Sequence, residues 1–317
     1  DIRSNTALGI WHLRRGEFTT AETCLRKAIE RLTRRNPNPS TGEAHYHLGL
    51  SLRHLGRIDA AYDALYKATW NAAWRGPAHL ALAEIDGTRG ALADALDHVE
   101  EALRHDVESS VARNLRAALL LRLGRAADAD ALLSETLARD PLDARARALK
   151  GLPFDGDDQL YLDVAIETAR GGFVADALAL LEARIAAVGQ AASPPLHYHA
   201  AMLSGRLGKS AEPHLAAAAK ASPDYCFPAR LEDIAALEAA IEANPADGRA
   251  PCYLGNLLYD RRRHADAIVM WERSVAIDPS WSIPWRNLGI GYFNIEGSKG
   301  KAVAAYDKAL AANPRDA

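Results

Sequence analysis

The chain has 317 residues, of which 49% are hydrophobic and 25% are charged, and 38 basic side chains nearly balance 41 acidic ones. These proportions are those of an ordinary globular protein, so they exclude a disordered or collagen-like chain. The formal net charge of −3 offers no basic excess for nucleic acid, and no apolar run is long enough to cross a membrane. We therefore predict neither nucleic-acid nor membrane partners.

Residue usage indicates both the compartment and the fold class. The three cysteines, Cys24, Cys226 and Cys252, form no CxxC pair, so we expect a reducing, cytoplasmic compartment. Alanine is about a fifth of the chain and β-branched residues are sparse, which favours an all-α fold. Arginine well above lysine, beside so much alanine, suggests a GC-rich bacterial source.

Glycines in short turns recur along the chain and indicate a repeat. In chain order they are Gly16, Gly56, Gly90, Gly124, Gly172 and Gly208, at successive spacings of 40, 34, 34, 48 and 36 residues. Nearer the C-terminus, Gly255 and Gly289 are 34 residues apart. A period of about 34 residues predicts tandem pairs of antiparallel helices.

Each period predicts a first and a second helix that cross at small residues. The first helix needs a small residue about eight positions in, and the second needs an alanine about twelve positions later, because only small side chains allow a close approach. In chain order the pairs are Gly9 with Ala21, Gly49 with Ala61, Ala83 with Ala95, Ala117 with Ala129, Ala165 with Ala177, Gly255 with Ala267, and Gly289 with Ala302.

The copy nearest the C-terminus matches a known signature throughout. Residues 285–292 read Trp-Arg-Asn-Leu-Gly-Ile-Gly-Tyr and are followed by Ala302, Tyr306 and Ala309. On these residues, and on the copies before them, the chain resembles the tetratricopeptide repeat (TPR) family along nearly its whole length. The resemblance implies an all-α, right-handed α-solenoid of about eight helix pairs, plus a half repeat at residues 231–242 that lacks its own first helix.

An insertion interrupts the repeats near the middle of the chain. About fourteen residues that end at Asp158 separate the fourth and fifth helix pairs. We therefore predict an N-terminal TPR lobe over residues 1–143, a linker over residues 144–158 and a C-terminal TPR lobe over residues 159–317.

A looser resemblance rests on residues 66–75, 82–86 and 222–228. These stretches look like parts of a family of large bacterial proteins, in which a β-rich N-terminal region of unassigned function precedes a tetratricopeptide array. Members of that family are suspected of ties to carbohydrate metabolism. The resemblance implies that this chain, which opens at Asp1 without a methionine, is the array of a longer polypeptide.

Inspection of the motifs predicts no catalytic or metal site. Residues 297–302 differ from a phosphate-binding loop in their glycine spacing, and residues 155–158 have the glycine of a calcium loop at the wrong place. The two His-Tyr-His stretches, 45–47 and 197–199, place their histidines on divergent sides of a helix, so neither pair closes on a metal. We therefore predict no enzyme activity, no cofactor and no metal.

The first helices carry the candidate binding residues. In tetratricopeptide arrays the first helix of each pair lines a concave groove, and that register transfers to this chain residue by residue. The candidates are Arg14, Tyr46, Arg53, His54, Asn114, Arg122, Arg170, Tyr198, Arg206, Asn256, Tyr259, Arg286 and Phe293. The arginines among them suit bidentate binding of a carboxylate or phosphate.

Several of these arginines also have a structural interpretation. They end first helices, where a cation is favoured by the helix dipole and can bond the last carbonyls. Pairing with neighbouring acids such as Asp128 or Asp176 would likewise favour a structural role.

The predicted function is a non-catalytic scaffold whose groove binds a peptide, a partner protein or another domain of its own polypeptide. The alternative is an accessory region of a carbohydrate-linked bacterial enzyme whose active site lies outside this chain. The parent reading frame and its genomic neighbours would discriminate between the two.

Overall fold

The computed structural model describes residues 1–34 and 39–315. In these residues every regular element is a helix, and none is long and apolar enough to span a membrane. The chain divides into two compact units, Asp1–Ala177 (unit 1) and Leu178–Ala317 (unit 2).

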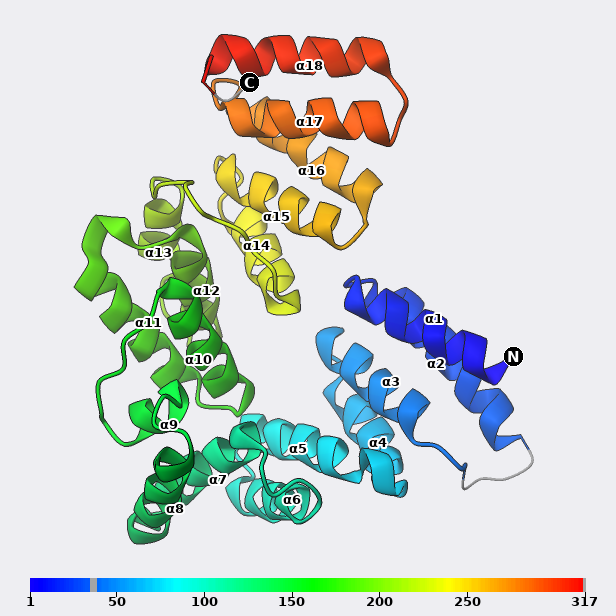
Figure 1. The fold of residues 1–317 in the computed structure, drawn as a ribbon, viewed down its shortest axis with the longest axis vertical. Helices are drawn as coiled ribbons and strands as arrows, with labels where there is room; N and C mark the ends of the chain where they lie inside the picture. Colours follow the sequence, from blue (N-terminus) through cyan, green and yellow to red (C-terminus); the bar gives the residue numbers. More distant parts are fainter. Residues whose placement is uncertain (35–38, 316–317) are drawn as a thin grey trace. The chain divides into compact units, whose positions relative to one another are not determined.

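Unit 1 consists of helices that pack in chain order (Figure 1). They are α1 (Ile2–Arg14), α2 (Phe18–Thr33), α3 (Glu43–His54), α4 (Ile58–Ala68), α5 (Ala72–Arg89), α6 (Leu92–His105), α7 (Ser110–Arg122), α8 (Ala126–Arg139), α9 (Ala144–Leu149) and α10 (Asp158–Arg170). Each helix from α1 to α9 contacts the next, and α1–α3, α3–α5 and α7–α9 are also in contact. The first helices α1, α3 and α5 therefore form a layer of their own.

Unit 2 repeats this arrangement after α11 (Val174–Val188), which begins in unit 1. Its elements are a short 3-10 turn (Gly189–Ala191), α12 (Pro194–Arg206), α13 (Glu212–Ala218), α14 (Leu231–Ala243), α15 (Arg249–Asp260), α16 (His264–Ile277), α17 (Ser282–Asn294) and α18 (Lys299–Ala312). Helix α12 contacts α13 and α14, and each helix from α14 to α18 contacts the next.

The small residues of the repeat lie where paired helices cross. A Cβ added to Gly49 would lie 2.5 Å from Cγ of Leu65, and one added to Gly289 would lie 2.6 Å from the ring of Tyr306. The partner alanine Ala61 is completely buried. These contacts confirm the predicted register at both ends of the chain.

Replacing Gly49 or Gly289 with leucine should lower the free energy of unfolding by about 1–3 kcal/mol, because the side chain overpacks a crossing that is already in contact. Denaturant melts followed by circular dichroism measure the loss. Gly300 is a matched control, since a Cβ there would meet nothing within 4 Å. A loss below a few tenths of a kcal/mol in both crossing variants contradicts the register.

The predicted linker contains a helix. Asp143 accepts a hydrogen bond from the backbone N–H of Ala146 at 2.8 Å, which caps the start of α9. Helix α9 then packs against α7 and α8, in the place of a short first helix. The division into lobes at residues 144–158 stays a prediction, and the two compact units meet at Ala177.

Helix α14 is the predicted half repeat. No helix precedes it over residues 219–230, and it packs against α12 and α15. The α-helices of the described residues are eight helix pairs, the unpaired α14 and the short α9. The predicted all-α solenoid class is therefore confirmed.

Candidate partner-binding face

Six polar side chains from four helices of unit 1 lie together, and we call them the polar cluster. Its members are Tyr46 and Arg53 of α3, Glu84 of α5, Arg145 of α9, and Glu167 and Arg170 of α10. Three of them, Tyr46, Arg53 and Arg170, belong to the set predicted from the sequence.

The polar cluster contains one satisfied ion pair and one poorly satisfied arginine. Arg53 donates a hydrogen bond to the carboxylate of Glu84 and so joins α3 to α5. Nη1 of Arg145 lies 3.7 Å from a carboxylate oxygen of Glu167. The Arg145 side chain is only 4% exposed, and its Nε and Nη2 have no hydrogen-bond partner among the described residues. A buried guanidinium in this state is costly unless an acceptor satisfies it.

Burial dominates the protonation behaviour of the polar cluster. It lowers the pKa of Arg145, although the carboxylates of Glu167 and Glu84 act in the opposite direction. It raises the pKa of Glu167 above its ordinary value, despite attraction from Arg145 and Arg170. Burial and the nearby charge of Glu84 also raise the pKa of the Tyr46 hydroxyl. The cluster therefore lies in a poorly solvated part of the unit, where an added charge interacts strongly.

The turn after α10 covers the neighbouring part of this face. Phe173 is 7% exposed and belongs to a core cluster with Ala83 of α5 and Leu115 of α7. Two backbones also meet here, because a Cβ on Gly87 would lie 2.3 Å from the carbonyl oxygen of Gly171. The chain therefore packs its own turn against α5 and α7.

Two predicted residues at the ends of α1 and α3 are exposed. His54 is exposed at the end of α3 and stacks on Phe18 with ring centroids 4.3 Å apart. Arg14 is exposed at the end of α1.

Arg122 and Asn114 make structural contacts within unit 1. Arg122 forms an ion pair with Asp176, and its guanidinium lies 5.5 Å from the ring centroid of Phe173. Pairing of an arginine with Asp176 is one of the two pairings that the sequence predicts for a structural role. Asn114 is 2% exposed and donates to both carboxylate oxygens of Asp143 at 3.0 Å. A binding role for these two residues stays a prediction.

The remaining candidates belong to unit 2. Tyr198 is buried and donates a 2.7 Å hydrogen bond to Asp247. Oδ1 of Asn256 accepts hydrogen bonds from Trp271 at 2.9 Å and Asn287 at 2.8 Å.

The other unit 2 candidates are less buried. The Tyr259 ring packs beside those of His264 and Trp271, and Phe293 is 53% exposed. Arg206 contacts the sulfur of Met202 at 3.8 Å, and Arg286 is half-buried. A groove made by these residues stays a prediction.

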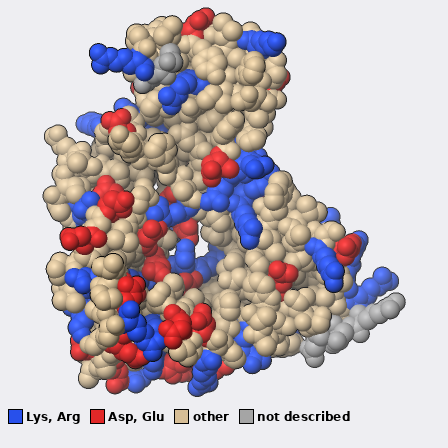
Figure 2. Space-filling model, in the orientation of Figure 1, with Lys and Arg blue, Asp and Glu red and all other residues tan. Residues whose placement is uncertain are grey.

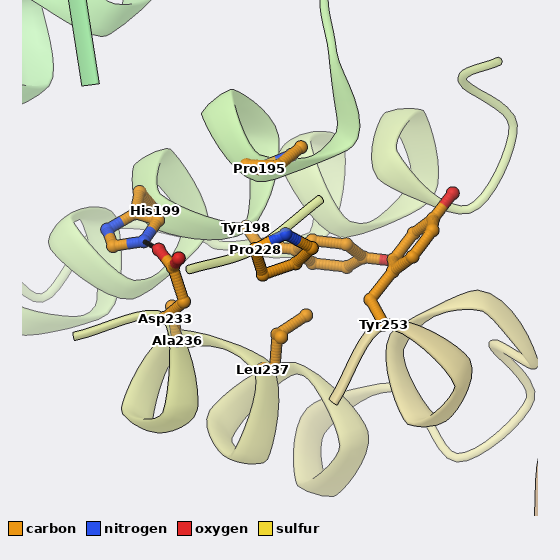
Figure 3. A pocket seen from close by; sticks show the side chains of 8 residues that line it. All are labelled: Pro195, Tyr198, His199, Pro228, Asp233, Ala236, Leu237 and Tyr253. Carbon is orange, nitrogen blue, oxygen red and sulfur yellow. Dashed lines mark hydrogen bonds and ion pairs between the residues drawn. The ribbon is translucent and has the colours of Figure 1, made fainter. Parts of the chain in front are cut away.

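A small pocket in unit 2 is lined in part by a buried histidine–aspartate pair (Figure 3). Nε2 of His199 lies 2.8 Å from Asp233, whose other oxygen accepts from the backbone N–H groups of Ala229 and Arg230 at 2.9 Å. These bonds tie α12 to the start of α14. No group of three or more His, Cys, Asp or Glu residues in the described part of the chain is placed to hold a metal ion.

Charges of both signs alternate on the surface of unit 1. Figure 2 shows Lys and Arg interspersed with Asp and Glu over α7 to α9. Cross-repeat pairs account for part of this pattern, such as Arg139 with Glu108 at 2.8 Å and Lys150 with Asp130 at 2.9 Å. Recognition on this unit would therefore depend on individual charge positions rather than on one basic surface.

Arg145 and Glu167 were missed by the sequence prediction of the site. Arg145 falls in the stretch predicted to be a linker, although Asp143 is a good N-cap residue before a run of helix formers. That cap signal would have identified α9 and placed Arg145 on a first helix.

These features define a helical repeat protein whose first helices carry the candidate polar site. Two family models, both described as tetratricopeptide repeat, match the chain over residues 6–74 and 234–280, and over residues 88–152. Together they cover more than half of it. The chain belongs to the tetratricopeptide repeat family, as predicted, and the larger bacterial family with a β-rich region stays a prediction.

Three solved structures illustrate the similarity. A tetratricopeptide repeat protein from Parabacteroides merdae is 15% identical, with 98% of each chain covered and a TM-score of 0.42. YrrB, described as a TPR protein with an unusual peptide-binding site, is 18% identical over 68% of this chain and 92% of its own, with a TM-score of 0.27. The TPR domain of P58(IPK) is 15% identical over 100% and 94%, with a TM-score of 0.29.

Proposed function

We propose that the protein is a non-catalytic scaffold that binds an extended segment of a partner protein, or of another domain of its own polypeptide, across α1 and α3 of unit 1. The observation that carries the proposal is the polar cluster, where the buried Arg145 has two donors without an acceptor among the described residues. Repeat arrays generally offer extended surfaces of this kind rather than one deep pocket.

The chemistry of the polar cluster favours a segment that carries a carboxylate. Arg53 and Glu167 at its edge keep about a fifth of their side-chain surface exposed. An acidic side chain that enters beside them supplies acceptors to guanidinium donors in a poorly solvated place, where charged hydrogen bonds are strong. Tyr46 and its neighbour Trp74, with ring centroids 5.0 Å apart, provide an apolar surface beside the charge.

The nucleophile candidates support a non-catalytic role. Burial raises the pKa of the Cys226 thiol to about 12 and also raises that of Cys252, so neither is a thiolate at neutral pH. The buried His199 is hydrogen bonded to Asp233, which caps α14.

The proposal predicts that Arg145→Met weakens peptide binding without unfolding the protein. Methionine keeps an apolar stem and removes a buried guanidinium whose Nε and Nη2 have no acceptor, so its desolvation penalty is relieved. Glu167, which is 23% exposed and 3.7 Å away, keeps access to water when that charge is lost. Peptides selected from a displayed random dodecapeptide library on the full chain should be rich in Asp and Glu. Their Kd for the variant should rise about thirtyfold or more, since a lost buried charge pair costs about 2 kcal/mol or more.

Arg104→Met is the matched control, because Arg104 of α6 is 72% exposed and lies outside both the polar cluster and the predicted set of binding residues. It should leave the Kd unchanged, and calorimetry would measure both variants at low and high salt. Selected peptides without acidic residues, or an unchanged Kd for Arg145→Met at an unchanged melting temperature, would overturn the proposal.

A further inference from the structure

The charges in and beside the polar cluster are balanced before any segment binds. The charged members of the cluster are Arg53, Arg145, Arg170, Glu84 and Glu167. Asp143, the N-cap residue of α9, adds a third carboxylate, whose charge acts on both Arg145 and Glu167. When all three carboxylates are ionised, they balance the three arginines. A further carboxylate from a bound segment therefore leaves an excess negative charge in a poorly solvated place, where like charges repel strongly.

Hydrogen bonds hold two of these carboxylates in their ionised form. Glu84 accepts a hydrogen bond from Arg53. Asp143 accepts from the side-chain amide of Asn114 at 3.0 Å and from the backbone N–H of Ala146 at 2.8 Å. Because such bonds favour the charged state, these two carboxylates stay ionised when another negative charge arrives.

Glu167 is the carboxylate placed to take up a proton. It lies 3.7 Å from Nη1 of Arg145, which is too far for a hydrogen bond, and its side chain is 23% exposed, so water reaches it. Burial already raises the pKa of Glu167, and the charges of Asp143 and Glu84 act in the same direction. Arg145 and Arg170 lower that pKa. A ligand carboxylate that bonds the free Nε or Nη2 of Arg145 weakens this opposing attraction.

We propose that the binding of an acidic segment at the polar cluster is coupled to the uptake of a proton by Glu167. The inference rests on the function proposed above and concerns the regulation of the same site. The carboxylate of the segment replaces Glu167 as the partner of Arg145, and a proton from the solvent forms an O–H bond on Glu167. The charges of the occupied site then balance again. Affinity should therefore rise as the pH falls through the range in which the complex takes up this proton.

Calorimetry of the full chain measures the coupling directly. The probe is a selected acidic dodecapeptide that contains no histidine, so that the peptide itself does not titrate near neutral pH. Titrations at pH 7 in two buffers with different ionisation enthalpies should show that the wild type takes up protons on binding. Its Kd should fall about tenfold between pH 8 and pH 6, since a nearby like charge raises the pKa of a carboxyl group strongly. The wild type alone gives this result, so the measurement does not depend on the folding of a variant.

Glu167→Gln imitates the protonated form at every pH. At pH 8 it should bind the peptide about tenfold more tightly than the wild type does, because glutamine does not repel the incoming carboxylate. Its Kd should change little between pH 8 and pH 6, and its proton uptake should be lost. A purely structural role for Glu167 predicts weaker binding at every pH instead. Glu108→Gln is the matched control, because Glu108 is 76% exposed and lies outside the polar cluster, and it should keep the pH dependence of the wild type.

The outcomes separate this inference from the proposed function. Acidic peptides that bind the wild type without proton uptake would overturn the inference alone. The same pH dependence in Glu167→Gln as in the wild type would also overturn it alone. Selected peptides without acidic residues would overturn both the inference and the proposed function.

Discussion

Replacing Gly172 with alanine is expected to destabilise unit 1 by about 3 kcal/mol or more, because two independent costs act at one position. Gly172 has φ of +91°, a conformation that alanine adopts only with strain. A Cβ there would also lie 2.3 Å from the carbonyl oxygen of Gly87 and 2.4 Å from its carbon. Both atoms belong to the backbone, so a side-chain rotation cannot relieve the contact.

Gly90→Ala separates the two costs. Gly90 has φ of +74°, but a Cβ there would meet nothing within 4 Å. The free energy of unfolding of Gly90→Ala should therefore fall only by the conformational cost, which is about 1 kcal/mol. Denaturant melts measure both variants, and hydrogen exchange of peptides from α5 and α10 assigns the loss to unit 1. Equal losses in the two variants would show that the backbone contact contributes nothing.

This contact also bears on the candidate site. It holds the end of α10 against α5, and α10 supplies Glu167 and Arg170 to the polar cluster while α5 supplies Glu84. Gly172→Ala, which loosens this crossing, should therefore lower the affinity for acidic peptides as well as the free energy of unfolding. The packing of Gly172 against Gly87 therefore supports the positions of Glu84 and Glu167 in the polar cluster.

The helix pairs could be predicted from the sequence because their signal is local and repeated. Gly49 and Gly289 lie at helix crossings as expected, since a close approach leaves no room for a side chain. Helix α9 was not predicted, because its six residues are too few to show the spacing of a full pair. Its only local signal is the N-cap at Asp143.

The repeat register predicts the position of a residue on its helix, but not which distant side chain will bind it. Tyr46, Arg53 and Arg170 meet in the polar cluster. Asn114 and Tyr198 have equivalent register positions, yet each is buried against an acid 29 or 49 residues away. Each acid lies two residues after a proline, Pro141 or Pro245, and outside the pattern of small residues at the helix crossings. The tertiary structure is what reveals that the two side chains are already bound.

Asp233→Ala is expected to destabilise unit 2 by about 3–5 kcal/mol near neutral pH, since it removes one member of a buried, hydrogen-bonded pair. Asp233 and His199 are each 2% exposed. The substitution leaves the histidine without its partner and removes the acceptor of two backbone N–H groups at the start of α14. Asp224→Ala is the control, because Asp224 is exposed and bonds only to Ser222 nearby, and it should cost under about 0.5 kcal/mol.

The effect of Asp233 should also depend on pH in a defined direction. Burial alone would raise the pKa of its carboxyl group, but the hydrogen bond and charge of His199 and the two backbone N–H groups outweigh burial and hold it below 3.8. A depressed folded-state pKa contributes stability above the unfolded value and loses it as the pH falls through the folded value. The difference between wild type and Asp233→Ala should therefore narrow as the pH falls below 3.8. Denaturant melts across this range measure it, and a difference that stays constant down to pH 2 would mean that Asp233 stabilises α14 without its charge.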